Sequence, residues 1–565
     1  MPDTADARRT EATVDAVTIQ VLRNKVASLV DEMHYHFYRS GYSTIIRESR
    51  DFSCVILDAR GRLITPPPMF FHGTVYPHFV GRVLELYAPE EIRDGDVFVS
   101  DHPYEAGVPH VSDMGFVAPI LCDGVLIGFS GSIAHKADIG GTNPGSTSAN
   151  STEIYHEGLL LPPIRMCEGG EYSTDIERLI LANSRQPDLV RGDIRAQIAA
   201  TRMGATRMQE LGARFGADVV IGAFDAILSG AAEELQAAIR AMPDGTSTAT
   251  GYMDDDGIDR DLPVKFSVTV TVDGDDIAFD FSDSGPQAKG PVNLRPSMVE
   301  ACVFYSLIGA LGPDLHFNDG MRDVVKFVYA PRTVTNAESP APVSSYQKAN
   351  LKLVDVILEA LAHFTPARAI AGSGSSGSLL VNWQQGGREG HTNLQYEIFA
   401  SAYGGGAGHD GASMVATHLS NLHITPIEIL ESEFPCRIPE FGIVPDSGGA
   451  GEYRGGAAFR RRYELLQDGL VVRRYDRAKF PSTGIMGGHD GRPSRFVLVD
   501  RDGKEKDVPA AGRFELKAGE GFYLEKAGGG GYGDPSKRDP EAIARDIAEG
   551  YVTPEAAKRD YGYEG

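Results

Sequence analysis

Cysteine is scarce in this chain of 565 residues, and its apolar runs are short. The five cysteines are scattered and none belongs to a Cys-x-x-Cys pair, which excludes a cysteine-based zinc finger and is typical of a reducing compartment. No stretch reaches the roughly 18 apolar residues that a membrane-spanning helix needs, and residues 1–15 lack the apolar core of a signal peptide. We therefore expect a cytoplasmic protein that enters no membrane.

Basic side chains are also in deficit. Lys and Arg number 54 against 78 Asp and Glu, so the formal net charge is −24. A surface of that charge repels the phosphate backbone of nucleic acids and anionic lipids. We therefore expect no nucleic acid and no membrane among the partners.

Three further motifs are missing from the sequence. It contains no Gly-x-x-x-x-Gly-Lys-Ser/Thr loop, no strand-coupled Gly-x-Gly-x-x-Gly with an acidic partner, and no Gly-x-Ser-x-Gly turn. If the reaction uses ATP, the nucleotide is therefore expected to bind to another polypeptide.

The apolar pattern changes several times along the chain, which is too long for one ordinary core. Residues 13–40 and 175–241 have helical periodicity, with breaks expected at Gly192 and Gly216, whereas residues 96–133 are typical of short strands. We predict an α+β fold with several sheets, packed helices, glycine-rich loops at the site and a β-rich C-terminal half. The expected domains are a metal-site domain with a helical segment (1–245), an α+β middle domain (246–430), a β-rich domain (431–535) and a helical tail (536–565).

Histidines and carboxylates gather within residues 100–166. The stretch holds two pairs of the form His-x-x-Asp, 25 residues apart, and a third histidine beside a glutamate: His110 and Asp113, His135 and Asp138, His156 and Glu157. Imidazole nitrogens and carboxylate oxygens on short turns are the ligands from which a mononuclear or dinuclear metal site is built. A single pair is common by chance, and histidines that cap polar turns would also explain it. The repetition is what favours a metal site.

Asp51 stands directly before an apolar strand in the phrase ESRDFSCVIL. A carboxylate at this place is commonly a surface group at the start of a strand. The functional alternatives are an additional metal ligand or a general base.

Ten phrases, taken in order, resemble the hydantoinase B/oxoprolinase family over nearly the whole chain. Among them are HPYEAGVPHVSD, AHKADIGGTNPGS, EIYHEGLLLPP and YGGGAGHDGAS. That family includes B subunits of ATP-dependent N-methylhydantoinases, lactam hydrolases of the caprolactamase type, and subunits of acetone and acetophenone carboxylases. The chain has one residue more between Tyr104 and His110 than the usual motif of the family. The loop expected to shape the substrate pocket therefore differs from that of the family.

The resemblance implies a divalent metal, zinc or manganese, and a set of site residues. The metal ligands would be His110, Asp113 and His135, and the residues that line the same cavity as catalytic groups would be Asp51, Asp138 and His156. Asp138 or Asp51 would take the proton of the attacking water, and His156 would complete the shell or contact the substrate. The implied partner is a hydantoinase A-type, kinase-like subunit that uses ATP, which makes a hetero-oligomer.

From these residues and this resemblance we predict the B subunit of an ATP-dependent amidohydrolase. Its small-molecule substrate would be a cyclic amide such as a hydantoin, 5-oxoproline or a lactam. Two alternatives stay open, a subunit of an ATP-dependent ketone carboxylase and a scaffold subunit without catalysis. A bicarbonate-dependent product would identify the first, and absence of bound metal would favour the second.

Overall fold

The computed structural model describes residues 14–375, 377–383, 393–419, 421–509 and 511–565. Its N-terminal part is a six-stranded sheet in the order β1-β4-β3-β2-β5-β6. The strands are β1 (Phe52–Asp58), β2 (Val97–Ser100), β3 (Asp113–Cys122), β4 (Val125–His135), β5 (Ile164–Glu168) and β6 (Glu171–Tyr172). The helices of this part are α1 (Ala16–Ser40), α2 (Val75–Leu86), α3 (Pro103–Ala106), α4 (Thr174–Asn183), α5 (Pro187–Phe215) and α6 (Ala217–Arg240).

This first sheet is buried on both faces. One core cluster joins Val55 and Phe129 of the sheet to Phe266 and Val303 of the middle of the chain. On the opposite face α5 packs on β3 and β4, and α1 packs on α5. Strands covered on both faces are mostly apolar, and every residue of β1 is buried. The core therefore crosses the boundary predicted at residue 245, and the domain limits remain predictions.

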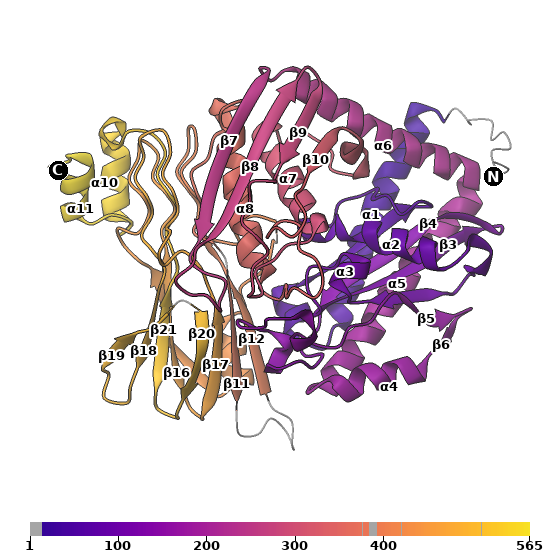
Figure 1. Cartoon of the computed structure of the whole chain (residues 1–565), viewed down its shortest axis with the longest axis horizontal. Helices are drawn as coiled ribbons and strands as arrows, with labels where there is room; N and C mark the ends of the chain where they lie inside the picture. Colours follow the sequence, from indigo (N-terminus) through magenta and orange to yellow (C-terminus); the bar gives the residue numbers. More distant parts are fainter. Residues whose placement is uncertain (1–13, 376, 384–392, 420, 510) are drawn as a thin grey trace.

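The middle of the chain forms a four-stranded sheet in the order β10-β9-β8-β7, in which β10 runs parallel to β9. Figure 1 shows this sheet beside α7 and α8, between the N-terminal part and the C-terminal strands. The elements are β7 (Gly245–Met253), β8 (Val264–Asp273), β9 (Asp276–Asp280), β10 (Val325–Val328), α7 (Pro296–Leu311) and α8 (Tyr346–Leu361).

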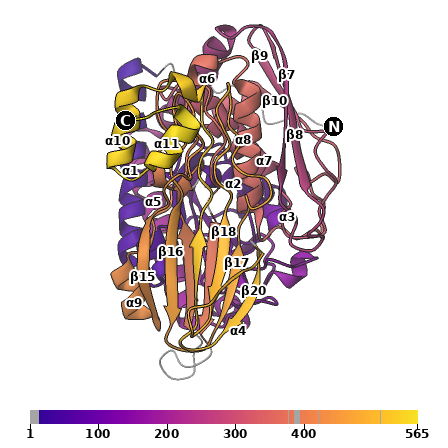
Figure 2. The ribbon, with the colours of Figure 1, turned by 90° about the vertical axis from the view of Figure 1, so that its left-hand side faces the viewer.

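The C-terminal half is rich in strands, as predicted. One sheet has the order β12-β11-β17-β20 and another β15-β16-β21-β18-β19, and a shared apolar cluster that includes Trp383, Val471 and Phe522 joins them. The strands are β11 (Gly377–Trp383), β12 (Asn393–Phe399), β13 (Ser401–Ala402), β14 (Ser413–Val415), β15 (Cys436–Ile443), β16 (Phe459–Leu465), β17 (Gly469–Arg474), β18 (Arg495–Val499), β19 (Glu505–Asp507), β20 (Ala511–Leu516) and β21 (Gly521–Glu525). Figure 2 shows the terminal helices α10 (Pro540–Ala548) and α11 (Pro554–Tyr561) above these sheets, and α9 (Ile427–Glu433) beside them. The α+β class is confirmed.

Short helical turns complete the described elements. Two of them, η1 (Ile45–Ser49) and η2 (Phe70–His72), lead into the candidate site. The others are η3 (Pro89–Glu91), η4 (Pro144–Ser146), η5 (Ile154–His156), η6 (Asp319–Asp323), η7 (Pro366–Arg368) and η8 (Pro535–Lys537).

One of the two predicted helix breaks is wrong. Helix α5 continues through Gly192, where an added Cβ would lie 2.2 Å from Cγ of Tyr42. The glycine is therefore explained by close packing rather than by a turn. The break falls instead at residues 184–186, and Gly216, with φ of 91°, separates α5 from α6 as expected.

Helix length and apolarity bear on the expectation that the chain enters no membrane. Among the described residues, no single helix combines the length and apolarity needed to cross a bilayer. The bent pair of α5 and α6 meets both criteria only when the two are taken together.

Candidate metal centre

Strand register brings the first group of side chains together. In the antiparallel pairing of β3 and β4, Asp113 stands directly opposite His135. The backbone N–H of His135 donates to the carbonyl oxygen of Asp51 at 3.1 Å, immediately before β1. Three neighbouring strands, β1, β3 and β4, thus begin or end at the same end of the sheet, which confirms that the predicted motifs lie at adjacent strand ends.

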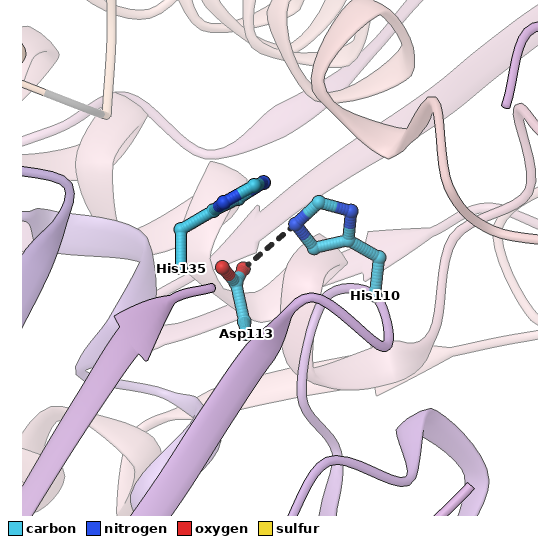
Figure 3. A group of neighbouring side chains, drawn as sticks. All are labelled: His110, Asp113 and His135. Carbon is cyan, nitrogen blue, oxygen red and sulfur yellow. Dashed lines mark ion pairs between the residues drawn. The ribbon is translucent and has the colours of Figure 1, made fainter. Parts of the chain in front are cut away.

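His110 reaches this edge from the turn before β3. The N–H of Asp113 donates to the carbonyl oxygen of His110 at 3.1 Å, and Nε2 of His110 lies 3.3 Å from Oδ2 of Asp113. Figure 3 shows the rings of His110 and His135 on either side of the Asp113 carboxylate, with ring centroids 5.1 Å apart. One ligand atom of each residue lies within 4.8 Å of the others, so a single cation can contact all three.

A second group shares Asp113 and was missed in part by the sequence analysis. Asp51, His72 and Asp113 also offer ligand atoms within 4.8 Å of one another. His72 ends η2; its Nδ1 lies 2.9 Å from Oγ of Ser53 and its Nε2 lies 3.8 Å from Oδ2 of Asp113. Its phrase, PPMFFHGT, carries no acidic residue at ligand spacing, so only the burial of the ring in the fold identifies it.

The two carboxyl groups of the cluster have opposite pKa shifts. Burial alone would raise the pKa of Asp113, but His110 and then His72 outweigh it and hold that pKa well below its ordinary value. Burial, followed by the charge of Asp113, raises the pKa of Asp51 well above its ordinary value. The buried Lys136 stands behind them, and burial lowers its pKa to about 8. The cluster is therefore a desolvated site in which added positive charge would favour two ionised carboxylates.

A small cavity of about 10 Å³ opens on the cluster, which is about the space that one water molecule needs. Tyr396 stacks on His135 with centroids 4.8 Å apart, and Tyr346 lies 5.0 Å from the ring of His110. The lining residues are Asp51, Phe71, His110, His135, Ser344, Tyr346, Gln347, Tyr396, Ile398 and Leu422. No glycine and no residue of the loop 100–109 is among these described lining residues. The expectations that glycine-rich loops lie at the site and that this loop shapes the substrate pocket therefore stay predictions.

Asp138 is placed away from this cavity. Its carboxylate accepts hydrogen bonds from the backbone N–H groups of Gly140, Gly145 and Arg185, and from the Arg185 guanidinium at 2.9 Å. Both oxygens are engaged in holding the glycine-rich loop after β4. The second His-x-x-Asp pair is therefore split, with only His135 in the cluster.

His156 is also placed outside the cluster. It ends η5 on a partly exposed turn, where its Nδ1 lies 3.4 Å from the backbone N of Thr152. It is not among the residues that line the cavity. The structure therefore brings together Asp51, His110, Asp113 and His135 of the six predicted residues, and adds His72.

The donor set fits a divalent cation. Within the described part of the chain, neither carboxylate oxygen of the buried Asp113 has a hydrogen bond of good geometry, although Oδ2 lies 3.3 Å from Nε2 of His110, and such groups are nearly always satisfied. His110, His135 and Asp113 form one ligand group, and Asp51 shares Asp113 in a second group with His72, both without any cysteine. Such imidazoles and carboxylates suit zinc or manganese.

Comparisons with known proteins agree with the resemblance noted in the sequence. The B subunit of a putative D-/L-hydantoinase from Pseudomonas sp. is 31% identical, over 97% of this chain and 95% of its own. The crystal structure of an ATP-dependent caprolactamase from Pseudomonas jessenii has a TM-score of 0.90 at 27% identity, covering 97% of this chain and 96% of that chain. A nucleotide-free acetone carboxylase structure has a TM-score of 0.87 at 20% identity, covering 97% and 79%, which shows a shared fold.

The profile of the hydantoinase B/oxoprolinase family matches residues 15–535. This match spans the first sheet, the middle sheet and the C-terminal strands, and it includes every residue of the candidate metal centre. The chain is a member of the hydantoinase B/oxoprolinase family.

Proposed function

We propose that the chain is the metal-dependent B subunit of an ATP-dependent amidohydrolase that opens a cyclic amide. The observation that carries this proposal is the buried Asp113 carboxylate, which lies between His110 and His135 with one ligand atom of each residue within 4.8 Å of the others. The named relatives, a hydantoinase and a caprolactamase, support a hydantoin, lactam or related ring as the substrate.

Asp51 is proposed as the fourth ligand. His110 and His135 are neutral ligands, so Asp113 alone would leave one positive charge of a divalent cation uncompensated in a buried site. Asp51 lines the same cavity and is 6% exposed, and its carboxylate makes the ligand set neutral overall. Burying an uncompensated charge is costly, so we assign one cation to the site and place His72 behind Asp113 as a support.

A divalent cation held there would lower the pKa of a bound water to about 7 and polarise the substrate oxygen. The chain's own residues supply the remaining requirements. Asp51 and Asp138 are the two predicted proton acceptors, and only Asp51 lines the cavity. Its carboxylate can therefore take the proton of the attacking water and later return it to the leaving nitrogen. The rings of Tyr346 and Tyr396 contact the two imidazoles, which are both buried.

The proposal includes a partner. An amide carbonyl is deactivated by its nitrogen, and phosphorylation of its oxygen makes the carbon accessible to water. The sequence has no phosphate-binding loop of the Gly-x-x-x-x-Gly-Lys type, so ATP would be used by a kinase-like A subunit in a hetero-oligomer. We place this complex in the cytoplasm.

The proposal predicts ATP-dependent ring opening. The chain, reconstituted with a hydantoinase A-type subunit, zinc or manganese and ATP, should open a hydantoin, 5-oxoproline or a lactam with one ADP formed for each ring opened. Chromatography of the products and an ADP assay measure both quantities. A product that forms only with a ketone and bicarbonate would replace the proposal with carboxylation. Turnover by a metal-free complex would assign the chain a scaffold role.

Asp51→Asn is expected to weaken metal binding at least about 100-fold and to lower ring opening by a similar factor, because residues that only orient ligands already account for 10–100-fold effects. Asp58→Asn is the matched control, since Asp58 is equally buried at the other end of β1 but is engaged with Arg62. Metal titration of both variants is the measurement. Retained metal with lost turnover would make Asp51 a general base only, and no change in either would remove it from the site.

A further inference from the structure

A segment from the C-terminal half of the chain, which comprises residues 418–419 and 421–423, reaches the cavity of the proposed metal centre. Leu422 lines the cavity, the carbonyl oxygen of Leu419 accepts from the N–H of Phe70 at 2.9 Å, and the N–H of His423 donates to the carbonyl oxygen of Ser49 at 3.2 Å. Phe70 lies two residues before His72, and Ser49 lies two residues before Asp51. The segment therefore contacts both η1 and η2, the turns that deliver two members of the cluster.

The backbone of this segment has an unfavourable conformation. His418, Leu419 and Asn421 have φ values of 50°, 52° and 49°, the left-handed region that side chains disfavour. Such residues persist only where the surroundings hold them, and they concentrate at functional sites. The conformation of this segment therefore depends on the contacts that its surroundings make with it.

His418 makes several contacts with its surroundings. Its side chain is buried, its Nε2 lies 3.0 Å from Oδ1 of Asp355, and its backbone N–H donates to the hydroxyl oxygen of Tyr403 at 2.8 Å. Nδ1 of His418 lies 3.4 Å from the hydroxyl of Tyr305, and the guanidinium of Arg477 donates to the other carboxylate oxygen of Asp355. An ion-paired carboxylate thus fixes the imidazole.

Asp355, which pairs with His418, is also linked to the cavity through its own helix. It lies on α8, the helix whose first residue, Tyr346, covers His110. We propose that Asp355 and His418 are positioning residues, which hold the segment against η1 and η2 and so keep Asp51 and His72 in place. The proposal rests on the proposed metal function, because the centre that is positioned is the one assigned there.

The test compares three variants of the full chain by zinc titration, by the visible spectrum of bound Co²⁺ and by thermal unfolding. His418→Ala should weaken zinc binding about 10- to 100-fold, the range found for residues that orient ligands, and change the Co²⁺ spectrum. His418→Gln, which keeps a side-chain N–H for Asp355, should restore most of both. His78→Ala is the control, because His78 pairs with Glu300 at 3.1 Å on a different surface and should leave zinc binding within about twofold.

Unchanged zinc affinity and Co²⁺ spectrum in His418→Ala, with only a lower melting temperature, would overturn the proposal and leave the pair a role in stability. If His418→Ala does not fold, Asp355→Asn decides in the same way. A parent chain that binds neither zinc nor Co²⁺ would overturn the proposed metal function and this inference together, so the two failures can be told apart.

Discussion

Replacing His110 and His135 together with alanine is expected to remove bound metal, from about one ion per chain to less than about a tenth of that, and to abolish ring opening. Two ligands are lost from a site where four side chains converge, and the remaining carboxylates, Asp51 and Asp113, cannot hold a transition metal against its hydration. Elemental analysis of the purified protein, followed by turnover of the reconstituted complex, measures both effects.

The matched control changes two other histidines of the same stretch, His102 and His156. The ring of His102 accepts a hydrogen bond from the N–H of Tyr104 at the start of α3, and His156 lies on a partly exposed turn. The His102→Ala/His156→Ala chain should keep its metal. A His110→Ala/His135→Ala chain that keeps its metal would contradict the assignment of the centre.

Arg461→Met is expected to lower the free energy of unfolding by about 3–5 kcal/mol, the usual effect of removing one partner of a buried ion pair. Arg461 and Glu397 are each 1% exposed and lie 2.8 Å apart, between β16 and β12. Without the guanidinium, Glu397 would be an uncompensated charge beside the apolar cluster of the C-terminal sheets. Urea unfolding at neutral pH measures the change.

Arg495→Met provides the comparison, because Arg495 pairs with Asp507 at 2.6 Å on an exposed edge of the same half. Exposed pairs contribute about 0–1 kcal/mol. Adding Glu397→Gln to Arg461→Met should recover much of the loss, since the buried charge is then absent. If Arg461→Met were as mild as Arg495→Met, the ion pair would not be needed for stability.

The sequence predicts those parts of the site that depend on local pattern. The first His-x-x-Asp pair meets His135 of the second because antiparallel register places Asp113 opposite His135, and this follows from a hairpin. Asp138 has the same spacing from His135, yet Arg185 and three backbone N–H groups engage it. The spacing could not show this because Arg185 belongs to a distant segment.

The missing parts of the site come from tertiary contacts. His72 reaches the cluster from η2, and Tyr396 covers it from β12, more than 250 residues further along the chain than His135. Neither His72 nor Tyr396 belongs to a sequence motif with metal-ligand spacing. Gly192 likewise could not be interpreted from the local sequence. A glycine is needed there because the ring of Tyr42 packs against it, not because the helix ends.

The cavity on the metal centre has a kinetic consequence. Pockets that accept organic ligands enclose about 300–1,000 Å³, whereas this one measures about 10 Å³. If a cyclic amide binds at this centre as proposed, the described conformation is too closed to admit it, and lining side chains such as Tyr396 on β12 or Tyr346 on α8 would have to move away first. Association would then be limited by an opening step, with a rate that saturates as substrate concentration rises instead of increasing in proportion to it.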